Sequence, residues 1–234
     1  MDMGFMVAGF EVVFANEYDK VFADLHDEGI CQWCKGHKKK FCPITTTKSI
    51  TELNPENILN EAFPQGTPKV WGIIGGPPCQ DFTMNGDGKG FDGERGKMTQ
   101  VFYNRIRKMS PSFFVMENVV GLVMRKGTKR ILDMLLLNHI CEDYYIDRIT
   151  LNALDFGVPQ YRKRVFIVGM RKELFPKIYY KEPNIDSISS MDFPWPRPKY
   201  VNADVSFPWP VKIPYGTTPE KPKEIPIELC VESC

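Results

Sequence analysis

The sequence predicts an α/β fold in which a parallel, Rossmann-like sheet is covered on both faces by helices. Several short runs are apolar throughout, which is typical of strands buried on both faces of a sheet. Most of these runs are separated by segments whose apolar residues recur with the period of a helix. The chain has 234 residues, of which 43% are hydrophobic, so it is long enough to close a core of its own.

Each element is expected from its own local pattern. Strands are placed where β-branched and aromatic residues gather, and helices where apolar residues recur every three or four positions. In chain order we expect a strand at 11–15, a helix at 17–26, a strand at 70–76, a helix at 99–109, a strand at 112–118, a helix at 128–140, and strands at 144–151 and 164–170. Sites in such sheets lie beyond the carboxyl ends of the strands, so the residues that follow each run are the candidates for function.

Two stretches depart from this pattern. Residues 29–49 are rich in lysine, cysteine and threonine and are expected to be irregular. From residue 175 onward prolines become frequent, and FPWP occurs at 193–196 and again at 207–210. Proline at that density is not compatible with helices or central strands. We therefore predict a catalytic unit at 1–174 and an extended, proline-rich tail at 175–234.

Composition bounds the class of protein. No stretch is long and apolar enough to span a membrane, and the first residues lack the pattern of a signal peptide, so we expect a cytoplasmic chain. The seven cysteines are scattered, which favours reduced thiols over a disulfide framework. A net charge of +1 gives no overall attraction to nucleic acid, so any such binding would depend on the basic clusters at 35–40, 125–130 and 162–164.

The most informative segment follows the strand at 70–76. It continues through Pro77, Pro78, Cys79 and Gln80 into a polar, glycine-rich loop that reaches residue 96. A cysteine on a proline-stiffened turn at a strand end is exposed and held in place, which suits a nucleophile. The alternative for Cys79 is a buried structural cysteine.

Two further strand ends carry polar side chains. Glu117 and Asn118 follow a wholly apolar strand, and a carboxyl group that is partly removed from water can hold or share a proton near neutrality. Gln160, Arg162 and Arg164 directly precede the last strand. Alternation places the two arginines on the same side, where their guanidinium groups could hold an anion. The alternatives are an ordinary capping carboxylate and a simple basic strand edge.

Together these segments, in the order PCQ, ENV and QxRxR, resemble the cytosine-C5 DNA methyltransferase family, and the resemblance runs from about Asp2 to Met170. It implies a fold built on an S-adenosylmethionine-dependent methyltransferase sheet. It also implies methyl transfer to C5 of cytosine in double-stranded DNA, in a restriction-modification system.

The resemblance assigns a role to each candidate. Cys79 adds to C6 of a flipped-out cytosine, Glu117 protonates or hydrogen-bonds N3, and Asn118 orients Glu117. Arg162 and Arg164 steady the O2 side of the base, Glu117 and the adjacent phosphate. The resemblance assigns Glu17, Pro77 and Pro78 to the cofactor, with Glu17 on the ribose hydroxyls, and it places Gln80 and Gln160 on the DNA side.

The sequence departs from the family pattern at both ends. The chain begins in what resembles the helix after the family's first strand and its FxGxGG loop, and no target-recognition domain is recognisable. We therefore expect the first strand to be missing, either because the start is assigned too late or because the chain is a truncated product. Target recognition is expected on a second polypeptide, with a broken gene as the equal alternative. Two alternatives stay open: a catalytically inactive fragment that binds a partner chain or DNA, and methylation of cytosine C5 in tRNA.

One cluster of potential metal ligands needs separate mention. Cys31, Cys34, His37 and Cys42 could bind zinc tetrahedrally. Their spacing is not that of a standard zinc knuckle, and the family requires no metal. No metal is therefore expected, with zinc at these four residues as the alternative.

Overall fold

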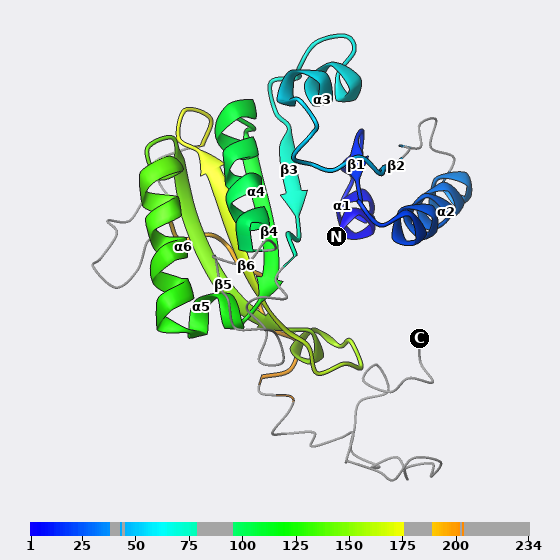
Figure 1. Ribbon diagram of the computed structural model, residues 1–234. Helices are drawn as coiled ribbons and strands as arrows, with labels where there is room; N and C mark the ends of the chain where they lie inside the picture. The colour runs from blue at the N-terminus through cyan, green and yellow to red at the C-terminus, as the bar shows by residue number, and fades with distance from the viewer. Residues whose placement is uncertain (38–42, 44, 79–95, 176–188, 202, 204–234) are drawn as a thin grey trace, which may run out of the picture.

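The computed structural model describes residues 1–37, 43, 45–78, 96–175, 189–201 and 203. Its elements are α1 (Asp2–Val7), β1 (Ala15–Asn16), α2 (Lys20–Gly36), β2 (Thr45–Thr46), α3 (Pro55–Ala62), β3 (Gly72–Gly75), α4 (Gly96–Met109), β4 (Phe113–Val119), α5 (Gly121–Met124), α6 (Lys126–His139), β5 (Tyr144–Asn152), the 3-10 helix η3 (Ala153–Phe156) and β6 (Lys163–Arg171). The predicted α/β class is confirmed (Figure 1).

The main sheet has four strands in the order β3-β4-β6-β5. Strands β3 and β4 are parallel, whereas β6 runs antiparallel to both of its neighbours. The expectation of a wholly parallel sheet was therefore wrong at β6. The reason is local: only residues 153–162 separate β5 from β6, which is too short a connection for the crossover that a parallel pair requires.

The amino-terminal region forms a separate two-stranded parallel sheet, in which Ala15 pairs with Thr45 and Asn16 with Thr46. The strand expected at 11–15 is thus reduced to β1. Helix α2 begins after Asp19, whose side chain accepts the N–H groups of Val21 and Phe22, as an N-cap does.

Helix α2 also runs further than expected. It continues to Gly36, so residues 29–36 are not irregular, as predicted from their composition. The buried positions Ala23, Ile30 and Cys34 continue one helical stripe across this stretch. That spacing, and not the lysine and cysteine content, decides its structure.

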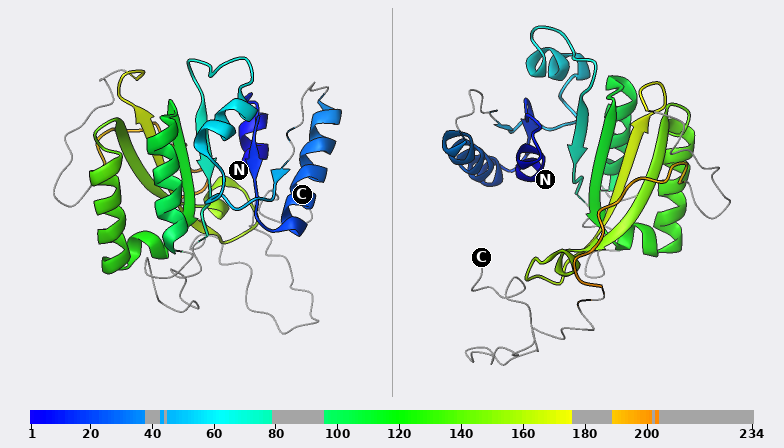
Figure 2. Two further views of the ribbon diagram at one scale, coloured as in Figure 1. Left: turned by 45° about the horizontal axis from the view of Figure 1, so that its top comes forward. Right: turned by 180° about the vertical axis from the view of Figure 1, so that it is seen from behind.

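The core lies between the sheet and the helices α4 and α6, which pack on the same face (Figure 1). Tyr103 and Ile106 of α4 and Leu136 of α6 meet Phe114 and Ile167 of the sheet. The opposite face, where helical cover was also expected, carries the extended residues 189–195 (Figure 2).

The extended segment is held by one buried carboxylate. Asp147, 7% exposed, accepts hydrogen bonds from Ser189 Oγ at 2.7 Å, from Trp195 Nε1 at 2.7 Å and from the N–H of Phe193 at 3.3 Å. A buried carboxylate is stable when several donors satisfy it. Part of the proline-rich region is therefore bound to the sheet, while the boundary drawn at residue 174 stays a prediction.

None of the described helices is both long enough and apolar enough to cross a membrane.

Gly169 is required by the packing of the core. It lies opposite Phe114 in the β4–β6 pair, and a Cβ at position 169 would lie 2.0 Å from the ring of Phe114, which is fully buried. We expect Gly169→Ala to lower the free energy of unfolding by about 1–3 kcal/mol, the usual cost of overpacking. Denaturant titration measures the difference.

Gly127 provides the matched control, since it lies in α6 and a Cβ there would meet nothing within 4 Å. Gly127→Ala should leave the stability unchanged or raise it by up to about 1 kcal/mol, because alanine favours the helix. Equal stabilities of the two variants would contradict this account of the core.

Candidate active site

The candidate site lies at the carboxyl end of β4, where two neighbouring residues point to opposite faces of the sheet. Asn118 is 1% exposed, and its Nδ2 donates to the carbonyl oxygen of Pro77 at 3.2 Å. Its Oδ1 accepts the N–H of Val119 at 2.9 Å. Asn118 thereby joins the end of β4 to the loop that follows β3.

Glu117 lies on the other face and beside the same loop. A Cβ at Gly76 would lie 3.4 Å from Glu117 Oε2, an ordinary van der Waals distance. The loop after β3 therefore passes directly beside the carboxylate.

The two arginines meet this carboxylate from β6 and from the residue just before it. Arg164 Nε lies 2.9 Å from Glu117 Oε1, and an Nη of Arg162 lies 3.7 Å from the same oxygen. The prediction that Arg162 and Arg164 share one side is confirmed. The side chain of Arg164 is 25% exposed and that of Arg162 is 47% exposed, so the Arg164 contact is the less screened of the two.

A pocket of about 490 Å³ opens at this carboxylate. Its volume falls within the range of small-molecule sites, roughly 300–1,000 Å³. The lining combines a carboxylate and two guanidinium groups with apolar side chains: Met1, Glu117, Leu151, Ala153, Phe156, Arg162, Arg164 and Phe166. Such a lining can take a flat ring and pair its polar edge with charged donors and acceptors.

Asn152 is a site residue that sequence reasoning missed. It is 5% exposed, and its Oδ1 accepts the N–H of Arg162 at 3.1 Å and that of Leu154 at 3.4 Å. The N–H of Ala153 also donates to the carbonyl of Arg162 at 3.0 Å. Asn152 thus closes the base of the β5–β6 connection and fixes the backbone from which Arg162 reaches Glu117.

The residues predicted for the cofactor lie apart from this lining. Glu17 follows β1, its N–H donates to the carbonyl of Thr46 at 3.1 Å, and its Oε1 accepts the N–H of Asp19 at 2.9 Å. None of the described residues Glu17, Pro77 and Pro78 is among those that line the pocket. Pro77 is joined to it through Asn118.

Several predicted residues fall elsewhere. Cys79, Gln80 and Cys42 lie outside the described residues. Gln160 is described and exposed, in the β5–β6 connection. Among the described residues, Cys31, Cys34 and His37 do not form a metal-binding group, and the ring of His37 stacks on Trp33 with centroids 4.1 Å apart.

The comparison with known families decides the identity of this arrangement. The family described as C-5 cytosine-specific DNA methylase matches residues 1–206. The chain belongs to this family. The prediction made from PCQ, ENV and QxRxR is confirmed at the level of the family.

Individual relatives agree with this family assignment. Type II methyltransferase M.FnuDI of Fusobacterium nucleatum is 35% identical over 84% of this chain and 47% of its own length. Type II methyltransferase M.MthTI of Methanothermobacter thermautotrophicus is 37% identical over 85% of this chain and 55% of its own. The chain spans about half the length of the curated relatives it matches.

A solved structure shows the same fold. It is a crystal structure of an E. coli protein assigned as a prophage-encoded DNA modification methyltransferase. It is 30% identical, has a TM-score of 0.57, and covers 78% of this methylase chain and 47% of its own.

We expect Asn152→Ala to lower the free energy of unfolding by about 1 kcal/mol. Two backbone N–H groups of the β5–β6 connection lose their acceptor, while the change also removes the buried Nδ2, which has no hydrogen-bond partner among the described residues. Asn60→Ala is the matched control, since Asn60 is exposed on α3, and that change should stay within about 0.5 kcal/mol of the wild type. Chemical denaturation of both variants provides the measurement. A loss at Asn152 no larger than at Asn60 would show that the turn does not depend on this side chain.

Proposed function

We propose that the chain transfers a methyl group from S-adenosylmethionine to C5 of cytosine in double-stranded DNA, as the modification activity of a restriction-modification system. The observation that carries the proposal is the Glu117 carboxylate in its pocket, held by Arg164 and joined through Asn118 to the loop that leads to Cys79. Membership of the methylase family supports it.

The chemistry requires a nucleophile and a proton at one base. Cytosine C5 is too weakly nucleophilic to accept a methyl group directly. In the proposed step the thiolate of Cys79 forms a bond to C6, the electron pair of the C5–C6 double bond shifts into the C4–C5 bond, and the pair of the C4–N3 double bond moves onto N3, which takes a proton. C5 thereby becomes an enamine-like carbon that can take the methyl group. Loss of the C5 proton then restores the double bond and expels the thiolate.

The described residues would supply the proton and the orientation. In this role Glu117 holds a proton at N3, where negative charge would otherwise develop during the addition. Arg162 and Arg164 are donors only, so they suit the O2 acceptor of the base and also fix the Glu117 carboxylate. Asn118 keeps the carboxylate facing the loop after β3.

The cofactor would supply the methyl group. The chain offers Glu17 for it, a partly buried carboxylate at the end of β1 whose Oε1 accepts one N–H. A carboxylate has about four acceptor positions, so Glu17 can also accept hydrogen bonds from ribose hydroxyls, as acids do in related nucleotide-binding sheets. We assign Pro77 and Pro78 to the same ligand as the rigid wall beside it.

The substrate base would have to leave the DNA helix. C6 is covered by stacking within a duplex, so the base must be flipped into the pocket. We place Gln80 and Gln160 on the DNA side of the site. Contacts to phosphates would come from the basic clusters rather than from the net charge of +1.

We propose that a second polypeptide takes part in sequence recognition, with residues 1–174 as the catalytic part. In this proposal the proline-rich residues 175–234 lead toward the recognition part.

The test is a covalent trap. DNA in which every cytosine is replaced by 5-fluorocytosine presents all recognition sites, and fluorine cannot leave C5 as a proton does. With S-adenosylmethionine and the parts that complete the site supplied, we expect the wild-type chain to form an adduct that survives denaturing electrophoresis, and Cys79→Ala to form none. An undiminished adduct in Cys79→Ala would exclude this cysteine as the nucleophile.

Cys141→Ala is the control for cysteine loss. Burial raises the pKa of the Cys141 thiol, which leaves little thiolate, so this variant should form the adduct like the wild type. The same trap with 5-fluorocytosine in tRNA separates the substrates: an adduct with tRNA and none with DNA would favour the RNA reaction. No adduct with either would favour an inactive, binding subunit.

A further inference from the structure

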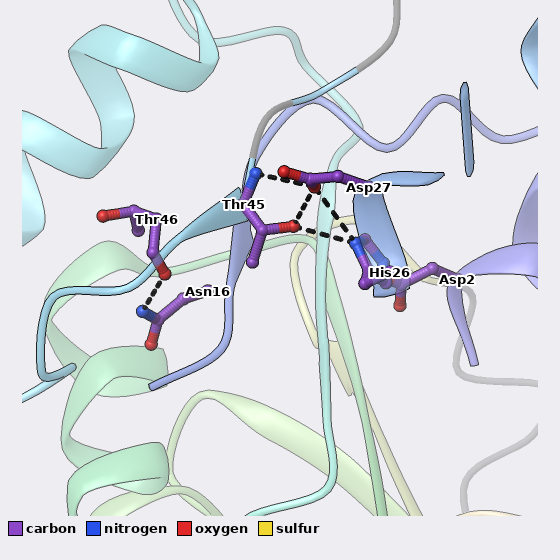
Figure 3. A network of polar contacts seen from close by, with 6 residues as sticks. All are labelled: Asp2, Asn16, His26, Asp27, Thr45 and Thr46. Atoms are coloured by element: carbon purple, nitrogen blue, oxygen red, sulfur yellow. Dashed lines mark hydrogen bonds and ion pairs between the residues drawn. The ribbon is translucent and has the colours of Figure 1, made fainter. Parts of the chain in front are cut away.

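A network of partly buried polar groups connects α1, α2 and β2 in the amino-terminal region (Figure 3). His26 of α2 contacts Asp2 of α1 through Nε2 at 2.8 Å and Thr45 of β2 through Nδ1 at 2.8 Å. Asp27 Oδ1 accepts the N–H of Thr45 at 2.9 Å as well as its hydroxyl. Three elements that are distant in sequence therefore meet at one imidazole.

The hydrogen-bond inventory fixes the orientation of this ring. An ionised carboxylate can only accept, so Nε2 of His26 must donate to Asp2. Nδ1 lies 2.8 Å from the hydroxyl oxygen of Thr45, whose hydrogen is donated to Asp27 Oδ1. Both ring nitrogens have partners, and the ring cannot rotate without breaking one contact.

Partial burial increases the contribution of the His26–Asp2 contact to stability. The side chains of His26 and Asp2 are 26% and 27% exposed, and exchange with water is restricted at such positions. The Lys20–Asp24 ion pair on the same helix has the same 2.8 Å distance but side chains that are 78% and 63% exposed. An exposed pair of that kind contributes little.

The network lies beside the Glu117 pocket in the sequence and in the fold, through Asp2 and its neighbour Met1. Asp2 is the first residue of α1, and its neighbour Met1 lines the pocket that holds Glu117 and Arg164. On the other side, Thr45 is the register partner of Ala15 in the strand that precedes Glu17. The β1–β2 pair and the four-stranded sheet are separate sheets, so no strand pairing between these two sheets fixes the distance between Glu17 and the pocket. The contacts that join α1, α2 and β2 contribute to it.

We propose that His26 is a positioning residue: through Asp2 it holds the first turn of α1 against the wall of the Glu117 pocket, and through Thr45 it holds that turn in register with Glu17. His26 touches no reacting atom in this role. It sets the position of Glu17, on the cofactor side, relative to the Glu117 pocket, on the base side. The catalytic part of its test rests on the proposed function.

The first readout is independent of catalysis. Hydrogen exchange of the full chain reports on the amides of Phe5 in α1 and of Ala8 and Phe10 just after it, which donate within the first ten residues. In His26→Ala we expect these amides to exchange about tenfold faster, the effect of losing one hydrogen bond to a charged group. Amides of α4 should not change. Unchanged exchange in α1, or equal acceleration in α4, would overturn the proposal.

The second readout separates positioning from general support. In His26→Ala the KM for S-adenosylmethionine should rise about tenfold while kcat stays within about twofold. His26→Gln, whose amide can still donate to Asp2, should recover most of both effects. Asp24→Asn is the matched control on the same helix and should behave as the wild type. A fall in kcat alone, or no recovery in His26→Gln, would contradict the assignment.

The two readouts distinguish the failure of each proposal. If the wild-type chain transfers no methyl group, the proposed function fails, and exchange in α1 still decides whether His26 and Asp2 hold this helix.

Discussion

The register of β4 against β6 is the constraint on which the site depends. Val119 lies opposite Arg164 and Glu117 opposite Phe166, and the side chains of Glu117 and Arg164 meet on the side of the sheet away from α4 and α6. A slip of one residue would turn Arg164 toward the helices and leave Glu117 without its 2.9 Å partner. The bulky contacts of the core oppose such a slip, since Phe114 must lie over Gly169. Core packing and site geometry are thus set by the same strand pair.

Buried polar side chains position the loops and segments next to the strand ends. Asn118 ties β4 to the loop after β3, Asn152 closes the β5–β6 connection, and Asp147 binds residues 189–195. Each satisfies backbone or side-chain groups that would otherwise be buried without a partner. These contacts hold loops at fixed distances from the strand ends, which is where the chemistry is proposed to occur.

Much of this could be predicted from the sequence. The apolar runs locate β3 to β6, because burial on a sheet selects apolar, β-branched and aromatic residues. Glu117, Arg162 and Arg164 follow from their places at strand ends, and their meeting follows from alternation. The direction of β6 was also readable in principle, from the short connection before it. Cys79 was predicted as well, and its place is outside the described residues.

The remainder depends on contacts between distant segments. Nothing in the neighbourhood of His26 indicates that its partners are Asp2 and Thr45, which lie 24 and 19 residues away. Asn152 and Asp147 likewise resemble ordinary strand residues until the partner segments are in place. The length of α2 was not predicted, because the prediction for residues 29–36 followed their lysine and cysteine content. The helical spacing of Ala23, Ile30 and Cys34 would have indicated the longer helix.

The Glu117 pocket is proposed to support methyl transfer to C5 of cytosine. Nucleoside mass spectrometry of DNA incubated with the chain and methyl-deuterated S-adenosylmethionine is the most direct test of this role. We expect labelled 5-methylcytosine with the wild type and about a hundredfold less with Glu117→Gln, the scale of losing one proton-transferring group. Label on the cytosine N4 or on adenine, or undiminished 5-methylcytosine with Glu117→Gln, would contradict it.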